Sequence, residues 1–129
     1  SNRIMSYQIK CYEYDIKSKR GDTFNRRDFE MTEYDDAIEP IVETPVNLTG
    51  ATMIMQIRAD SGEAILHTFS TANGKIVIDD APAGKFHIEA EVLNFTAGVY
   101  KHDLQITFAD GRVKTYYSGI FELTSDISE

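Results

Sequence analysis

Apolar and polar residues alternate along several segments of the chain, and the spacing of three and four residues that marks an amphipathic helix is hard to find. The cleanest alternation covers residues 100–108, where the even-numbered positions are apolar or aromatic except for His102. Residues 51–57 and 86–92 follow the same period of two. This period places one face of a strand in the core and the other in solvent, so the pattern predicts an all-β protein.

A turn signal lies between residues 64–69 and residues 75–78, two apolar runs that are each predicted as a strand. Asn73-Gly74 is the strongest two-residue hairpin signal in the chain, so the two runs are predicted to pair. Residues 79–84 follow, and Pro82 within them is predicted to interrupt pairing because proline has no backbone N–H to donate.

The remaining connections are also predicted as turns or loops. Residues 109–111 turn the chain back after the strand at 100–108, and Ser118-Gly119 precedes a last strand. The acidic segment 35–45 holds two prolines and is predicted to be an exposed loop. Short strands joined by turns, with no helices between them, predict an immunoglobulin-like antiparallel β-sandwich.

Two further candidate strand regions lie near the start of the chain. Apolar positions alternate over 7–11 and again over 12–16, and the change of phase at Cys11-Tyr12 predicts a β-bulge. Residues 23–31 form a weaker candidate, with inward side chains expected at Phe24, Phe29 and Met31.

The segment from Thr96 to His102 has the spacing of the corner at which an immunoglobulin-like chain crosses between its sheets. In this interpretation Gly98 and Tyr100 form the corner, and the tyrosine hydroxyl bonds to backbone. His102 takes the position of the second cysteine of such domains. We expect it to be a hydrogen-bonded core residue without a catalytic role.

Composition and charge indicate one ordinary globular domain. The chain has 129 residues, of which 42% are hydrophobic and 26% are charged, and this length suits a single core. Residues 1–4 are interpreted as an expression remnant or a disordered start, and residues 5–129 as one β-sandwich domain. A net charge of -8 argues against nucleic acid as a partner, since it is the wrong sign to neutralise phosphates. No apolar run reaches the roughly 18 residues of a membrane helix, so no membrane contact is predicted.

No catalytic, cofactor-binding or metal-binding motif stands out. His67, His87 and His102 lie on different predicted strands and are interpreted as three unrelated histidines. The acidic residues of 33–43 lack the order of a calcium-binding loop, and Asp79-Asp80 gives no better signal. Cys11 is the only cysteine, so no internal disulfide can form, which fits synthesis in a reducing cytoplasm. We therefore predict no enzymatic activity, no cofactor and no metal.

Four tyrosines are the candidate partner-binding residues. Tyr12 and Tyr14 lie in the first strand region, and Tyr116 and Tyr117 lie in the last. They could form a protein contact or a sugar-binding platform, and because side chains alternate along a strand, half of them must point inward.

Several short phrases occur in a fixed order along the chain. They are GDTF at 21–24, VNLTGA at 46–51, MQIR at 55–58, TANGKI at 71–76, TAGVYKHDL at 96–104, ADGRV at 109–113 and SGIF at 118–121. In this order the phrases resemble the small β-sandwich domains of bacteriophage and prophage tail modules. They are similar to the N-terminal domain of phage baseplate upper proteins, and the resemblance covers residues 21–126.

The resemblance implies a non-enzymatic structural component of a phage tail or baseplate with an immunoglobulin-like fold. Its expected partners are other tail or baseplate proteins, with self-association as a further option, and its expected location is the virion after synthesis in the bacterial host cytoplasm. The expected contact surfaces are the N-terminal strand, the acidic loop 33–43 and Tyr116-Tyr117. Two alternatives remain open: a carbohydrate-binding module, which needs exposed coplanar aromatic rings, and a small β-sandwich hydrolase, which needs a pocket with perturbed titratable groups.

Overall fold

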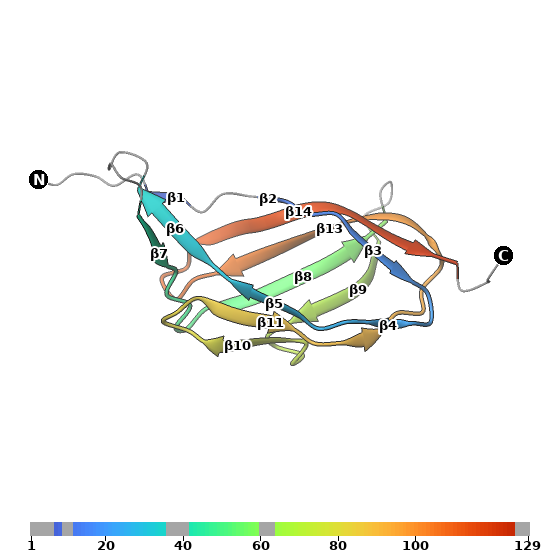
Figure 1. Ribbon diagram of the computed structural model, residues 1–129, viewed down its shortest axis with the longest axis horizontal. Helices are drawn as coiled ribbons and strands as arrows, with labels where there is room; N and C mark the ends of the chain where they lie inside the picture. The colour runs from blue at the N-terminus through green and yellow to red at the C-terminus, as the bar shows by residue number, and fades with distance from the viewer. Residues whose placement is uncertain (1–6, 9–11, 36–41, 60–63, 126–129) are drawn as a thin grey trace, which may run out of the picture.

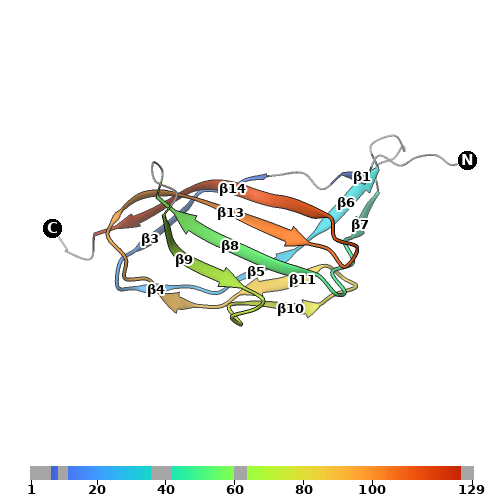
Figure 2. The same ribbon diagram turned by 180° about the vertical axis from the view of Figure 1, so that it is seen from behind.

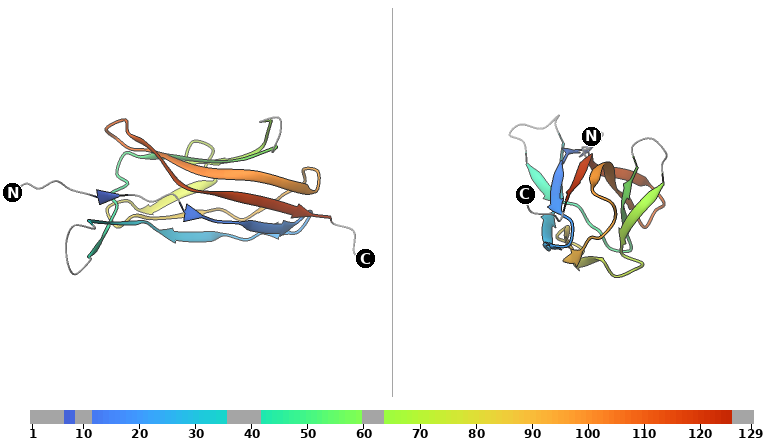
Figure 3. Two further views of the ribbon diagram at one scale, coloured as in Figure 1. Left: turned by 90° about the horizontal axis from the view of Figure 1, so that it is seen from above. Right: turned by 90° about the vertical axis from the view of Figure 1, so that its right-hand side faces the viewer.

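The chain folds into two layers of β-strands packed face to face (Figures 1 and 3). The computed structural model describes residues 7–8, 12–35, 42–59 and 64–125, and among them no helix could cross a membrane. The fold is an immunoglobulin-like antiparallel β-sandwich, as the sequence predicts. Its strands are β1 (Tyr7–Gln8), β2 (Tyr12–Glu13), β3 (Ile16–Lys19), β4 (Thr23–Phe24), β5 (Arg27–Glu30), β6 (Thr32–Asp35), β7 (Glu43–Pro45), β8 (Thr52–Arg58), β9 (Ile65–Ser70), β10 (Ile76–Asp80), β11 (Lys85–Ile88), β12 (Glu91–Val92), β13 (Gly98–Thr107) and β14 (Val113–Thr124).

The larger sheet has the strand order β2-β14-β13-β8-β9, and β3 also pairs with β14 (Figure 2). β13 lies antiparallel to β14 and β8, whereas β2 and β3 run parallel to β14. A register shift opposite Leu104 and Gln105 leaves Tyr116 as the extra residue of a bulge. The predicted turn at Ser118-Gly119 is wrong, because β14 continues through both residues.

The smaller layer contains the sheet β10-β11-β5 and the pair β12-β4. A third sheet, β1-β6-β7, lies at one end of the sandwich (Figure 1). The exposed loop predicted over 35–45 is wrong for residues 43–45, because these residues form β7 and pair with β6. Pro45 is tolerated there because β7 is the outer strand of its sheet. Three predictions fall outside the described residues: the bulge at Cys11-Tyr12, the assignment of residues 1–4, and the part of the loop at 36–41.

The Asn73-Gly74 turn links the two layers, so the predicted hairpin is wrong. β9 pairs with β8 in the larger sheet, whereas β10 pairs with β11 in the smaller one. The Asn73 side chain folds back on β9, donating to the carbonyl of Thr68 at 3.0 Å and accepting from the N–H of Ser70 at 3.0 Å. These bonds cap this part of the β9 edge, where another strand would otherwise find unpaired backbone groups.

The hairpin in this region lies instead between β10 and β11, so the predicted interruption at 79–84 is also wrong. The two strands are antiparallel neighbours, and the chain reverses through residues 81–84. Pro82 lies within the turn. Its missing N–H costs nothing there, because no hydrogen bond between the two strands needs it. Gly84 closes the turn with a backbone φ of 72°, a left-handed conformation that favours glycine.

The core lies between the two layers. The predicted inward side chains of β8 are buried, as are those of β13 from His102 to Ile106. Phe24 and Met31 are buried too, and Phe29 is half-buried against the same core. The strand predicted over 86–92 ends at Ile88, and Val92, predicted to point inward, is exposed.

Candidate functional site

The four tyrosines predicted to bind partners do not share an exposed surface. Tyr117 is only 2% exposed, and its hydroxyl donates to the sulfur of Met55 at 3.1 Å. Its ring packs against the rings of Tyr14 and His102. The prediction that Tyr117 contacts a partner is therefore wrong, because the bulge at Tyr116 leaves the Tyr117 side chain on the inner face of β14.

Tyr14 and Tyr116 are half-buried, and the side chain of Tyr12 lies outside the described residues. The Tyr14 hydroxyl accepts a hydrogen bond from Arg27 Nη1 at 2.8 Å. The rings of Tyr14 and Tyr116 make angles of 63° and 48° with the ring of Tyr117. Neither ring is coplanar with the ring of Tyr117, which is buried and cannot take part in a sugar-binding platform.

The predicted corner lies at the start of β13. The Tyr100 hydroxyl donates to the carbonyl of Thr96, which is the bond that the sequence predicts for such a corner. Gly98 lies beside this bond, since a Cβ there would be 3.3 Å from the Tyr100 oxygen. His102 is buried, with its Nε2 2.6 Å from the Tyr14 carbonyl oxygen. Burial lowers the pKa of His102, so at neutral pH its ring is uncharged and donates this bond.

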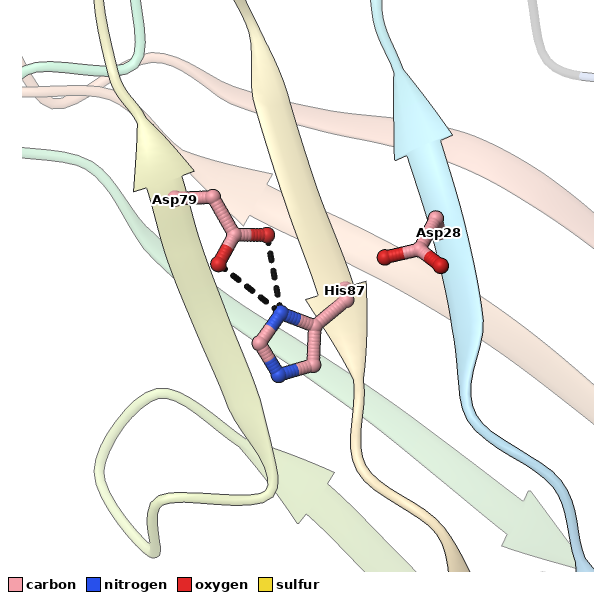
Figure 4. Close-up of side chains that lie close together, drawn as sticks. All are labelled: Asp28, Asp79 and His87. Carbon is pink, nitrogen blue, oxygen red and sulfur yellow. Dashed lines mark hydrogen bonds and ion pairs between the residues drawn. The ribbon is translucent and has the colours of Figure 1, made fainter.

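A cluster of charged side chains surrounds His87 on the outer face of the smaller sheet (Figure 4). Asp28 of β5 is the cross-strand neighbour of His87 in β11, and Asp79 is the extra residue of a bulge in β10. The Nδ1 atom of His87 lies 2.9 and 2.8 Å from the two carboxylate oxygens of Asp79. Its Nε2 atom lies 3.1 Å from Glu89 Oε2. We call Asp28, Asp79, His87 and Glu89 the His87 cluster.

The His87 ring is shielded from solvent although it points away from the core. Its side chain is 6% exposed, whereas those of Asp79 and Glu89 are 37% and 42% exposed. Burial lowers the pKa of His87, but the hydrogen bonds to Asp79 and Glu89 together outweigh that effect, so the pKa lies above its ordinary value. Arg26 approaches from the side of Asp28, with its Nη2 2.9 Å from that carboxylate.

The free energy of unfolding is expected to depend on pH through His87. Because its pKa is raised in the folded state, the folded protein binds the proton more tightly than the unfolded chain, whose histidine pKa is about 6.5. The resulting stabilisation is fully present below about pH 6.5 and is lost as the pH rises through the folded-state pKa. The stability advantage of the wild type over His87→Gln should therefore shrink as the pH rises above about 6.5, measured by urea unfolding with EDTA present. An advantage that stays constant or grows with pH would contradict this expectation.

The outer face of the larger sheet is the second candidate site, and no outward side chain of β8 or β13 on it is buried. Cross-strand pairing places Ile120, Lys101 and Arg58 in one row across three strands, and Ile65 of β9 ends the row. Five of the seven exposed large aliphatic side chains among the described residues lie on this face: Ile54, Ile65, Val99, Val113 and Ile120.

Comparison with known proteins gives distant structural matches only. No protein-family model matches the chain, and no curated protein matches it significantly. CopC from Methylosinus trichosporium OB3b is similar with a TM-score of 0.43 and 9% identity, over 88% of this chain and 89% of that one. Extracellular domains 3-5 of Drosophila OTK are similar with a TM-score of 0.40 and 13% identity, over 95% of this chain and 36% of that one. Murine CRIg is similar with a TM-score of 0.34 and 12% identity, over 94% of this chain and 98% of that one. Similarity at this level carries no argument about function, and the fold class follows from the strand pairing itself.

Sequence reasoning missed the His87 cluster for an identifiable reason. The three histidines do have separate partners, since His67 lies 3.2 Å from Glu91 and His102 bonds to backbone. Asp79 and His87 flank a turn, and a hairpin at that turn would have placed them close together. Pro82 instead led to the prediction that strand pairing is interrupted at this turn. Asp28 could not have been found in this way, because only the pairing of β5 with β11 brings it to His87.

Proposed function

We propose that this domain is a non-enzymatic assembly module of a bacteriophage or prophage tail or baseplate, which acts through protein–protein contacts. The ordered phrases along residues 21–126 support the particle context by their resemblance to phage baseplate domains. The outer face of the larger sheet supports the mode of action. In this proposal the chain is made in the host cytoplasm and is incorporated in the virion.

The exposed aliphatic side chains on the outer face carry the proposal. Ile120 and Val99 are 50% and 60% exposed, and Lys101 lies between them on the same face. Exposed aliphatic side chains interspersed with charged groups on one sheet face suit a protein interface. Asn73 caps part of the β9 edge, so we propose that the partner packs on the sheet face and does not extend the sheet there.

Mass spectrometry of particles purified from the induced source strain tests the particle context. The chain is expected at an abundance stoichiometric with the major tail proteins. Its absence from intact particles would overturn the proposal.

Substitutions on the outer face test the mode of action. Val99→Asp and Ile120→Asp place a charge where the partner would exclude water, so each is expected to lower incorporation into particles at least about tenfold. Val92→Asp is the matched control, because Val92 is 47% exposed but belongs to β12 of the smaller layer. Equal incorporation of all three variants, each checked for folding by thermal melting, would show that the outer face is not the contact surface.

A further inference from the structure

We propose that Asp28, Asp79 and His87 bind one divalent transition-metal ion of the Zn²⁺ class on the outer face of the smaller sheet. This site is separate from the outer face of the larger sheet. The test of metal binding is therefore independent of the test of the assembly role. The ligand atoms of the three residues lie within 4.8 Å of one another. Figure 4 shows the three side chains, which come from the neighbouring strands β5, β10 and β11.

The fold brings the three ligands together by two devices. Strand register places Asp28 directly opposite His87, with both side chains on the outer face. In β10, Val77 lies opposite His87, and Asp79 follows two residues later as the extra residue of a bulge. Asp79 consequently faces the His87 ring, with both carboxylate oxygens within 2.9 Å of Nδ1.

The donor set selects the class of metal. One imidazole nitrogen and two carboxylate oxygens match the ligands that Zn²⁺ accepts, and solvent can supply a fourth position. Ca²⁺ and Mg²⁺ prefer sites made of oxygen alone, so the histidine disfavours them.

Glu89 is not a metal ligand in this proposal, but it orients the His87 ring through a hydrogen bond to Nε2. When the Nε2–H of His87 donates to Glu89, the Nδ1 lone pair is directed toward Asp79, where the ion would lie. A carboxylate that holds the second nitrogen of a histidine ligand in this way fixes the tautomer and makes the ligand more basic. A metal ion can bind Nδ1 only when that nitrogen carries no proton, so protonation competes with metal binding and weakens it as the pH falls.

The surrounding charges also favour a cation. Asp28, Asp79 and Glu89 carry three negative charges around one ring, whereas two cations, Arg26 and Lys85, line the same pocket as Asp28 and Asp79. Arg26 approaches one oxygen of Asp28, with Nε at 3.0 Å and Nη2 at 2.9 Å. Arg26 thus competes with a metal ion for Asp28, and removing its charge should strengthen metal binding.

The test is a titration of the folded protein with Zn²⁺ against a chromophoric chelator, in a Cys11→Ser background that removes the only thiol. Binding of one ion per chain is expected, and Co²⁺ should give an absorption spectrum that changes with the loss of His87. Asp28→Asn and His87→Gln are each expected to weaken binding at least about tenfold, and Glu89→Gln about tenfold. Asp28 has an exposed side chain, so its variant keeps the test valid if His87→Gln fails to fold.

Two control variants separate this site from unspecific binding. His67→Gln removes another histidine that faces a single carboxylate, and it should leave Zn²⁺ affinity unchanged. Arg26→Gln should bind at least as tightly as the wild type, and weaker binding would contradict the placement of the ion beside Asp28. The proposal is overturned if the wild type binds no Zn²⁺ at one equivalent, or if Asp28→Asn binds as tightly as the wild type.

Discussion

Replacing Tyr117 by alanine is expected to lower the free energy of unfolding by about 3–5 kcal/mol, because it leaves a cavity where a large ring is buried. The ring lies between Tyr14, Phe29 and His102, which cannot all move to fill the space. Urea unfolding followed by tyrosine fluorescence or circular dichroism measures the change. A destabilisation of this size would also confirm that Tyr117 belongs to the core and not to a contact surface.

Tyr117→Phe is the matched control for this substitution. It keeps the ring and removes only the hydrogen bond from the hydroxyl to the Met55 sulfur. The expected cost is about 0.5–1.5 kcal/mol, the usual net value of one hydrogen bond. If Tyr117→Ala were as stable as Tyr117→Phe, the ring would not be packed as described.

Replacing Gly84 by alanine is expected to be the second strongly destabilising change. A Cβ at Gly84 would overlap the carbonyl oxygen of Met31 and would lie 3.0 Å from that of Val46. The backbone at Gly84 is also left-handed, which costs a residue with a side chain about 1–2 kcal/mol. Displacing the Met31 backbone adds about 1–3 kcal/mol, as overpacking does elsewhere. The shift in the urea midpoint measures the sum.

Gly74→Ala isolates the conformational part of this effect. Gly74 has a φ of 79°, but a Cβ there would meet nothing within 4 Å. It should therefore cost only the left-handed penalty of about 1–2 kcal/mol. Equal losses for the two variants would mean that the backbone of Met31 and Val46 does not approach Gly84 as closely as described.

The period of two along the chain was sufficient to predict strands, and for β8 and β13 it also predicted which side chains are buried. It was insufficient where a bulge changes the phase. Nothing in the residues around Tyr116 signals the bulge that leaves Tyr117 in the core, because the bulge depends on the pairing of β13 with β14. For the same reason, Tyr117 was assigned to a contact surface although the fold buries it.

Strand partnership was the other feature that local signals could not supply. Asn73-Gly74 does form a tight turn, as its residues require, but a turn does not determine whether its flanking strands join one sheet or two. That choice depends on the packing of β9 and β10 against strands far away in the sequence. The His87 cluster was missed for this reason, since its members meet only when β5, β10 and β11 are neighbours.

The parallel pairing of β3 with β14 has a mechanical consequence. Ile16–Lys19 lies beside Phe121–Thr124 as four residue pairs that run in the same direction. A force that draws the chain before β3 away from the chain after β14 slides these strands lengthwise past each other. Their hydrogen bonds are then loaded together, whereas an antiparallel hairpin pulled at its open end loses its bonds one after another. Tension applied along the chain therefore meets resistance at this short parallel pairing of β3 with β14.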